Sequence, residues 1–536
     1  MGSGARERRV QLPHAVWVPD RKAISNAEMA SETEMASEPE KGLSAHEEPI
    51  SPEGLKTRDG IVLMPQPSDD PNDPLNWSPF RKHAAMLTIA YLALVCYVAV
   101  TSLVAAIVPV AKTLEVPKSQ AVYLGSTPVA LYAVAPWLWS PLSHVLGRRP
   151  VLLMSNVIAI VGVAVAGTAT TYGACLVGRI ILGTGGSAFW TLGPASIGDI
   201  FFRHEKGKKI GISTLAIVVS PFLGTIVGGS ISQHLGWRAT QWIPLIFIAF
   251  GLVLQIFFLP ETIYIRDRPG QSSAFGSTAG SKAASGTKAS LWARYGIRIP
   301  KRGNDKNHRF LFIATRPFVL FKFPAVLLSS FWFGIAYLMH VGITAEIPIF
   351  FEDQYGFSQL DIGLTGFSGL IGALIGEAYA GPLLDFMAKR ALKQNVEWRP
   401  ERRLPAIWPA LVTVPAGLIL FGTGIQFDAK WIVPLVGQAL YIFGIEIATT
   451  VIQTYILECY PRQGAEVSLV FNLFRNLFSY TAPFFTQPGI VSLGFAAPYS
   501  LFGGFTAVFF PFTVGVLMWK GKEIREKSGD PGWSRD

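Results

Sequence analysis

The chain has 536 residues, of which 50% are hydrophobic and 15% are charged, and its mean hydropathy is +0.36. An average soluble protein has about 25% charged residues, so the composition excludes a large soluble protein and favours a helical membrane protein whose outer surface is covered by lipid. The three cysteines are too few and too scattered for a disulfide framework or a metal site, and the sequence predicts no metal and no cofactor. The meaning of the net charge of +10 depends on where the charges lie.

The first predicted element is a polar segment, residues 1–80, which is rich in Glu, Ser and Pro and which we expect to be a disordered tail without a signal peptide. Twelve apolar segments follow, and each is long enough to cross a bilayer, because a span needs about 20 mostly apolar residues. Their approximate bounds are 84–108, 121–143, 151–170, 174–200, 210–234, 241–259, 324–350, 362–384, 405–424, 432–457, 467–487 and 497–519.

A polar stretch separates the sixth span from the seventh. We therefore predict an all-α polytopic membrane protein with two six-helix halves, residues 81–260 and 323–519, joined by a cytoplasmic linker at 261–322 and followed by a short cytoplasmic tail at 520–536.

The Lys and Arg residues predict the orientation, because cytoplasmic loops carry an excess of them. With the N-terminus inside, 40 of the 46 fall in cytoplasmic loops and tails and four in outside loops, while Arg179 and Arg475 lie within spans. Both termini are thus predicted to be cytoplasmic. The positive charge indicates topology, so the expected surroundings are a lipid bilayer and no nucleic-acid partner is predicted.

The two halves repeat each other weakly. Residues 140–149, after the second span, and residues 381–390, after the eighth, share Pro-Leu and a basic pair at the same places. In the fourth and tenth spans, Asp199 corresponds to Glu458. Two related six-helix halves are typical of transporters that rock around a central site.

Several motifs resemble those of the major facilitator superfamily. The loop Ser140-Pro-Leu-Ser-His-Val-Leu-Gly-Arg-Arg-Pro150 is similar to its loop signature, Gly178-Arg-Ile-Ile-Leu-Gly-Thr-Gly185 to its Arg-bearing motif, and Ser220-Pro-Phe-Leu-Gly-Thr-Ile-Val-Gly-Gly229 to the motif associated with antiporters. Gly236-Trp-Arg238 and Pro260-Glu-Thr262 flank the sixth span as they do in the twelve-span drug:proton antiporter family.

Two further segments, Asp73-Pro-Leu-Asn-Trp-Ser78 and Pro400-Glu-Arg-Arg-Leu404, look like those of fungal members, a branch that includes multidrug, polyamine and secondary-metabolite exporters. The resemblance implies a secondary transporter that exports a small organic molecule in exchange for protons, as a functional monomer. We expect it in the plasma membrane, with the vacuolar membrane as the alternative. The chain departs from the family pattern at His144, where an acid is usual, and at Ser220 and Thr225.

Charged residues within the spans are the candidates for proton coupling. A cation at the centre of a span costs about 2.5–3.5 kcal/mol on insertion scales, so Arg179 has to face the bundle interior. The resemblance gives it a role in proton coupling, and the alternative is a structural arginine bound to carbonyls. Glu446, in the middle of the tenth span, could carry a proton or bind a cation, or be a buried packing residue. Glu377 could line the inner vestibule or pair with a loop base, and Glu346 is expected at the outer rim.

Polar and aromatic side chains in the spans predict a substrate cavity. Gln438, Glu446, Thr449 and Gln453 form one polar stripe, and Arg475 could pair with an acid or attract an anionic substrate. The predicted cavity residues are Gln438, Thr449, Gln453, Tyr337, His340, Trp332 and Arg475.

Gating is predicted at the cytoplasmic helix ends, where ion pairs can hold the halves together in one state and part in the other. The candidates are His144, Arg148, Arg149, Asp385, Lys389 and Arg390. Pro221, Gly224, Gly228 and Gly229 are predicted to permit bending and close approach of the fifth span.

Other functions are less well supported by the sequence. It contains no G-x-x-x-x-G-K-[ST] loop for an ATP-driven pump and no nucleophile elbow or His-Glu-x-x-His motif, so we predict no enzymatic activity. Two alternatives remain open: proton-coupled uptake of a cation or nutrient, and, more remotely, a non-transporting membrane sensor.

Overall fold

The computed structural model describes residues 57–58, 61–68, 70, 73–264, 310–394 and 399–531. Residues 1–56 of the predicted tail (1–80) and most of the predicted linker lie outside these residues. The described part is helical apart from a hairpin of two short strands, β1 (Thr57–Arg58) and β2 (Ile61–Val62). The predicted all-α membrane fold is confirmed.

The first half follows a short 3-10 turn, η2 (Pro74–Asn76), that is capped by the Asp73 carboxylate. Its helices are α2 (Pro79–Thr101), η3 (Val104–Ala106), α3 (Ile107–Thr113), α4 (Lys118–Val134), α5 (Pro136–Leu146), α6 (Arg148–Thr168), α7 (Tyr172–Ile200), α8 (Arg203–Leu235) and α9 (Ala239–Phe258).

The second half begins inside the predicted linker, with α11 (Phe310–Val319), and ends beyond the predicted last span, because α20 continues the helix into the predicted tail. Its other helices are η5 (Leu320–Lys322), α12 (Pro324–Tyr337), α13 (Met339–Tyr355), α14 (Gln359–Leu364), α15 (Gly366–Lys393), η6 (Pro400–Ile407), α16 (Trp408–Gln426), α17 (Ile432–Cys459), η7 (Pro461–Gln463), α18 (Gly464–Leu493), α19 (Ala496–Phe510), the π-helical turn η8 (Pro511–Gly515) and α20 (Val516–Ser528).

Eleven of the twelve predicted spans are long and apolar enough to cross a membrane, if α4 and α5, which meet at an angle of 44°, count as one. The remaining predicted span, 467–487, is helix α18. It has 30 residues but does not reach the same apolarity. The physical reason is that α18 carries Asn472, Arg475 and Asn476, all of which are buried inside the protein and not exposed to lipid.

Four of the predicted spans are interrupted at sites that hydropathy did not reveal. The helix is broken between α2 and η3, α4 and α5, α12 and α13, and α14 and α15, although Ser102, Ala135, Leu338 and Thr365 at these breaks keep right-handed helical dihedral angles. Pro136 explains the second break, because proline has no N–H for the helical ladder. The breaks after α2 and after α12 contain no proline, and carbonyls of the turns before them accept hydrogen bonds from side chains of α7 and α17.

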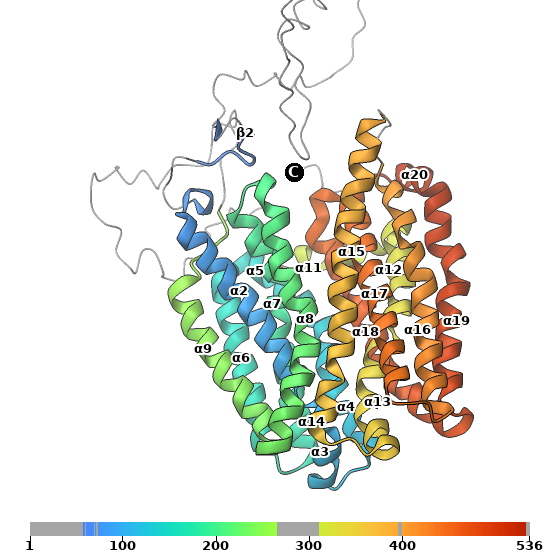
Figure 1. The fold of residues 1–536 in the computed structure, drawn as a ribbon. Coiled ribbons are helices and arrows are strands. Elements are labelled where there is room, and N and C mark those ends of the chain that lie inside the picture. Colours follow the sequence, from blue (N-terminus) through green and yellow to red (C-terminus); the bar gives the residue numbers. More distant parts are fainter. Residues whose placement is uncertain are drawn as a thin grey trace, which may run out of the picture.

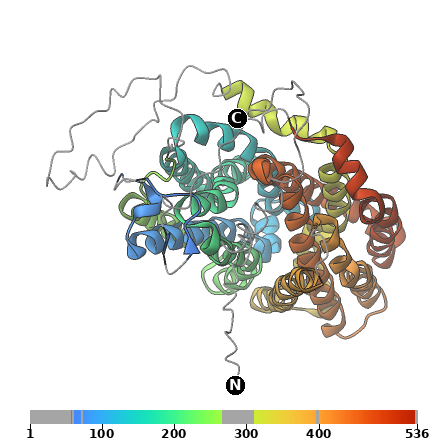
Figure 2. The same cartoon turned by 90° about the horizontal axis from the view of Figure 1, so that it is seen from above.

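The helices cross the bundle in alternating directions (Figure 1). We call the end at which α2 begins and α20 ends the terminal face, and the other end, where α3 and α14 lie, the opposite face. Viewed from above, the first half occupies one side of the molecule and the second half the other (Figure 2). The first described long helix therefore begins, and the last one ends, at the same face, and the space between the halves is where a central site can form.

Candidate transport site

The two halves are closed against each other at the opposite face by direct backbone contact between α8 and α14. A Cβ atom on Gly229 would lie 2.5 Å from both the carbonyl oxygen of Gln359 and the Cα atom of Gly363. The Gln359 amide also donates to Oε1 of Gln233 at 3.1 Å. Only glycine fits at this approach, so the predicted role of Gly229 in close packing has a concrete partner in the other half.

The other predicted glycines of the fifth span pack α8 onto the break after α2. A Cβ atom on Gly224 would meet the backbone of Val98 at 2.9 Å, and one on Gly228 would meet the backbone of Ser102. Helix α8 runs through Pro221 without a break. These residues therefore act here through close approach, and the bending predicted for them stays a prediction.

Two ion pairs join the halves at the same face. Lys112 lies 3.4 Å from Glu352, and Lys118 lies 2.6 Å from Asp353. Exposed pairs of this kind contribute about 0–1 kcal/mol each, so they add to the closure without dominating it.

On the other side of this closure, a cavity of about 630 Å³ extends between the halves to the terminal face. Arg148, Lys206 and Arg462 line its mouth at helix ends, and Tyr337, His340 and Glu446 line it in the middle of the bundle. The cavity can therefore be reached from the terminal face and is shut off from the opposite face.

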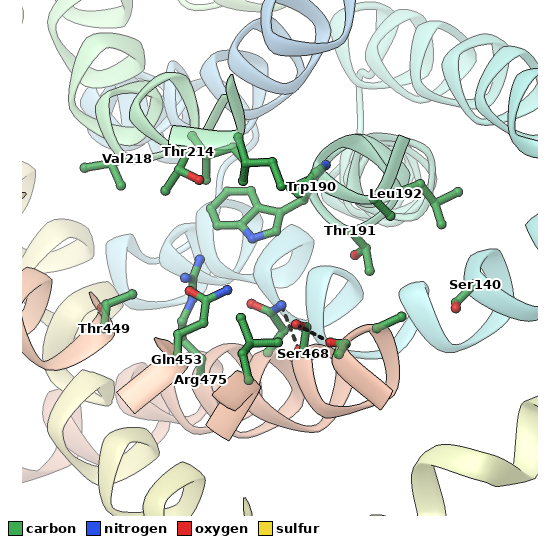
Figure 3. A pocket seen from close by; sticks show the side chains of 18 of the residues that line it. Ser140, Trp190, Thr191, Leu192, Thr214, Val218, Thr449, Gln453, Ser468 and Arg475 are labelled. Carbon is green, nitrogen blue, oxygen red and sulfur yellow. Dashed lines mark hydrogen bonds between the residues drawn. The ribbon is translucent and has the colours of Figure 1, made fainter. Parts of the chain in front are cut away.

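The structure brings six predicted proton-coupling and cavity residues to this cavity. They come from α12, α13, α17 and α18 and are Tyr337, His340, Glu446, Thr449, Gln453 and Arg475. Trp190 faces Arg475, Gln453 and Thr449 across the space (Figure 3). Both halves thus contribute to one binding wall.

Arg475 crosses the boundary between the halves. Its guanidinium carbon lies 4.7 Å from the ring centre of Trp190 in the first half and 5.1 Å from that of Tyr337 in the second. Trp190 is held in turn by Tyr97 and Tyr132, at ring distances of 4.7 and 5.4 Å. The rings stabilise the cation from both sides, but Nε of Arg475 has no hydrogen-bond partner in the part of the chain that the structure describes.

Glu446 is 7% exposed, at the middle of α17, and lines the cavity. Within the described residues its carboxylate accepts no hydrogen bond and makes no ion pair. Glu377 lies on the neighbouring helix α15 but does not line the cavity, and its Oε2 accepts a hydrogen bond of 2.9 Å from Thr450. Of the two predicted proton-coupling acids, only Glu446 faces the space that a substrate can enter.

Arg179 lies outside the cavity and is completely buried. Its Nε donates to the Leu124 carbonyl at 2.8 Å, its Nη1 to that of Ala99 at 3.0 Å, and its Nη2 to that of Val100. Ala99 and Val100 belong to the last turn of α2, whose carbonyls lack helical partners. The geometry matches the structural alternative, and the proton-coupling role of Arg179 stays a prediction.

The predicted gating residues separate into two groups. Arg148 pairs with Asp199 of its own half at 3.2 Å, and the Arg149 guanidinium donates to the Ile256 carbonyl. His144 lies on α5 close to this group and is partly buried. The Glu261 carboxylate accepts from the first two amides of α6, at 2.9 and 3.1 Å. Burial raises the pKa of Glu261 although these amides stabilise its charge.

In the second half the arginine–acid ion pair is formed by residues other than the predicted gating residues, whose gating role stays a prediction. Asp385, Lys389 and Arg390 are exposed on the projecting end of α15 and form no ion pair within the described residues. Arg403 instead binds both oxygens of Glu458, at 2.5 and 2.7 Å. Since Glu458 is the repeat counterpart of Asp199, each half has an arginine–acid pair at the equivalent place, and the repeat was a signal that could have located it.

Three other residues lie where the sequence did not place them. Trp332 is buried away from the cavity and donates to the Thr506 carbonyl at 2.9 Å. Gln438 accepts from Ser368 at 2.5 Å, nearer the opposite face. Glu346, expected at the rim, is completely buried and accepts from Thr486 and Gln487 of α18.

Several residues of the cavity wall were not predicted for it. They are polar or charged and come from α7, α8 and α18: Thr191, Asp199, Lys206, Thr214, Ser468 and Asn472. Asn472 and Arg475 share one face of α18 at a spacing of three residues, a polar pattern in an apolar helix that could have identified them.

The sequence and the fold both match known transporters. Residues 89–483 match the sequence model of the Major Facilitator Superfamily. The chain belongs to this superfamily. It is therefore a multi-pass membrane transport protein and not an enzyme, as predicted.

Members of the superfamily with similar sequences include fungal transporters. The MFS-type transporter penM of Penicillium rubens is 27% identical over 473 residues, which cover 88% of this chain and 90% of the relative. Efflux pump FUB11 of Gibberella fujikuroi is 28% identical over 403 residues, which cover 74% of this chain and 67% of the relative. These relatives agree with the fungal branch that the motifs predict.

The fold is shared with solved superfamily structures. The xylose transporter XylE from E. coli, in a partially occluded inward-open conformation, matches with a TM-score of 0.57 at 15% identity, covering 82% of this chain and 98% of that one. At this identity the likeness shows the fold alone.

Proposed function

We propose that this transporter exports a small organic molecule from the cytoplasm in exchange for protons. The terminal face would then be cytoplasmic, as the distribution of Lys and Arg predicts, and the structure would correspond to the inward-open state. The name of the FUB11 relative, an efflux pump, supports this direction.

The observation that carries the proposal is the Glu446 carboxylate, which faces the cavity and has no hydrogen-bond or ion-pair partner among the described residues. Charged groups within spans are a functional hypothesis by default. A carboxylate that is open to one side of the membrane at a time can take up a proton outside and release it inside. The groups that face Glu446 from the surrounding helices are Glu377 of α15, Tyr337 and His340 of α12 and α13, and Arg475 of α18.

The driving force follows from the charge that moves. Each elementary charge gains about 2.3 kcal/mol per 100 mV of membrane potential, so inward proton movement can drive export against a gradient. Because one chain forms the whole cavity, we propose a functional monomer. Export from the cell requires the plasma membrane.

The test separates proton coupling from substrate movement. Everted vesicles containing the wild-type protein or Glu446→Gln would be screened with a radiolabelled panel of amino acids, drugs and organic acids. We expect Glu446→Gln to keep substrate-for-substrate exchange and to lose accumulation driven by an imposed pH gradient, whereas Glu523→Gln, on the exposed side of α20, should behave as wild type. Full pH-driven accumulation by Glu446→Gln would rule out this role, and wild-type accumulation in the reverse orientation would indicate uptake.

A further inference from the structure

The transport cavity contains two charged side chains of opposite sign that have no ionic partner in the described part of the chain. Arg475 is 9% exposed and Glu446 is 7% exposed, and both line the same space. Within the described residues neither makes a hydrogen bond or an ion pair, and the two interact with each other electrostatically without forming a direct ion pair. Each therefore presents a buried charge to whatever occupies the cavity.

Arg475 lacks an acceptor. Cation–π contacts with Trp190 and Tyr337 stabilise the positive charge of Arg475 even though no acceptor is bound to it. They leave the N–H donors in the guanidinium plane unused, and this fork matches a carboxylate in a bidentate arrangement. An organic carboxylate would therefore complete this part of the cavity.

Glu446 lacks a donor. When ionised it can only accept hydrogen bonds, and the nearby acid Glu377 already accepts from Thr450 and supplies no proton donor. A ligand ammonium group would satisfy Glu446. It would also occupy the place of a transported proton, because a proton and an ammonium group cannot both neutralise one carboxylate.

We propose that the cavity binds zwitterionic amino acids or related amine-bearing carboxylic acids, with the ligand carboxylate on Arg475 and its ammonium on Glu446. The aromatic wall of Trp190 and Tyr337 accommodates an apolar body, and the volume of about 630 Å³ suits an aromatic amino acid or a small peptide-like product. The assignment rests on the proposed function for the cavity being the transport path.

This chemistry gives a physical basis for the exchange of ligand for protons. When the ligand is bound, its carboxylate neutralises Arg475 and its ammonium neutralises Glu446. The return state holds protonated Glu446 and an Arg475 cation that the two aromatic rings stabilise. Ligand and proton therefore compete for Glu446, and binding weakens as the pH falls. A ligand with only a carboxylate would behave in the opposite way, since a proton on Glu446 would remove a repulsive charge.

Three probes that share the phenylalanine side chain but differ in charge test the assignment. They are phenylalanine, N-acetylphenylalanine, which lacks the ammonium group, and phenylalanine methyl ester, which lacks the carboxylate. Binding to the purified full-length protein in detergent would be measured calorimetrically at two pH values. We expect phenylalanine to bind about tenfold or more tightly than either derivative, because each derivative leaves one buried charge unpaired. Phenylalanine binding should weaken at the lower pH.

Variants of Glu446 and Arg475 test which ligand group each residue binds. Glu446→Gln should abolish the preference for phenylalanine over N-acetylphenylalanine, and Arg475→Gln should abolish the preference over the methyl ester. Arg475→Lys should keep part of the second preference. Lys430→Gln and Glu523→Gln, both exposed, are the matched controls, and thermal unfolding checks that each variant is folded.

Equal or tighter wild-type binding of N-acetylphenylalanine, or no binding of phenylalanine, would overturn the zwitterion assignment. Unchanged preferences in the two variants would overturn it as well. These outcomes concern binding alone, so they are distinct from a failure of pH-driven export in vesicles.

Discussion

Arg179 and Arg475 look alike in the sequence, since each is a lone cation in an apolar helix, but the structure gives them opposite surroundings. Arg179 donates to three carbonyls and is completely buried outside the cavity. Arg475 lies between two rings, faces the cavity and has an unpartnered Nε. We infer that an intramembrane charge is structural where the protein itself completes its hydrogen bonds and is available for a ligand where it does not.

The difference arises from the break at the end of α2. The carbonyls of its last turn have no helical donors and form the negative end of the helix dipole, so a guanidinium on α7 satisfies them. The second half has a similar break after α12, but there the Tyr441 hydroxyl donates to the Ala336 carbonyl at 2.9 Å. A neutral side chain thus binds the carbonyl at this break, and Arg475, the arginine within the spans of that half, faces the cavity instead.

Among the variants that test this comparison, Arg179→Gln should have the largest effect on stability. Three buried carbonyls would lose charge-assisted donors, and we expect the free energy of unfolding to fall by about 2–4 kcal/mol. Unfolding in graded SDS, with helicity as the signal, measures this change. Arg179→Lys should be intermediate, because an ammonium keeps the charge but lacks the planar fork. A Gln variant with wild-type stability and lost proton coupling would instead establish a coupling role.

A smaller effect is expected at the corresponding break of the second half. Tyr441→Phe removes one neutral hydrogen bond and keeps the ring, so the expected loss is about 0.6–1.5 kcal/mol in the same unfolding assay. Tyr499→Phe is a suitable control, because the Tyr499 hydroxyl is buried without a partner and its removal should not destabilise the protein. A loss at Tyr441 as large as that at Arg179 would contradict the proposed difference between the halves.

The smallest effect on stability is expected at Arg475. Arg475→Gln removes a cation that no protein acceptor satisfies, so its free energy of unfolding should stay within about 1 kcal/mol of wild type or rise. Transport, in contrast, should be lost. A destabilisation comparable to that of Arg179→Gln would show that Arg475 is a structural residue too.

Much of this contrast was inaccessible to sequence reasoning. Hydropathy located the spans because helices that face lipid must be apolar, and even α18, which lines the cavity and is less apolar than the others, forms a helix over the predicted span 467–487. It could not locate the breaks after Thr101 and Tyr337, because the chain stays apolar across them. Without those breaks, nothing distinguishes Arg179 from Arg475.

The candidate site was predictable where a pattern lay within one helix. The polar stripe of α17 placed Glu446, Thr449 and Gln453 together, and the structure puts all three on the cavity wall. Interactions between helices were harder to predict. The sequence suggested an ion pair at the loop copy with Asp385, whereas the ion pair in the structure joins Glu458 to Arg403 of η6, which lies near Glu458 only because distant segments pack together.

The glycine contact between α8 and α14 also determines how the carrier can leak. Side chains that plug a passage can swing aside one at a time and let ions slip through. At Gly229 and Gly363 there is no side chain to swing, because backbone lies directly on backbone. The barrier can therefore part only when whole helices move, and a cell that keeps a steep proton gradient would lose little of it through the resting protein.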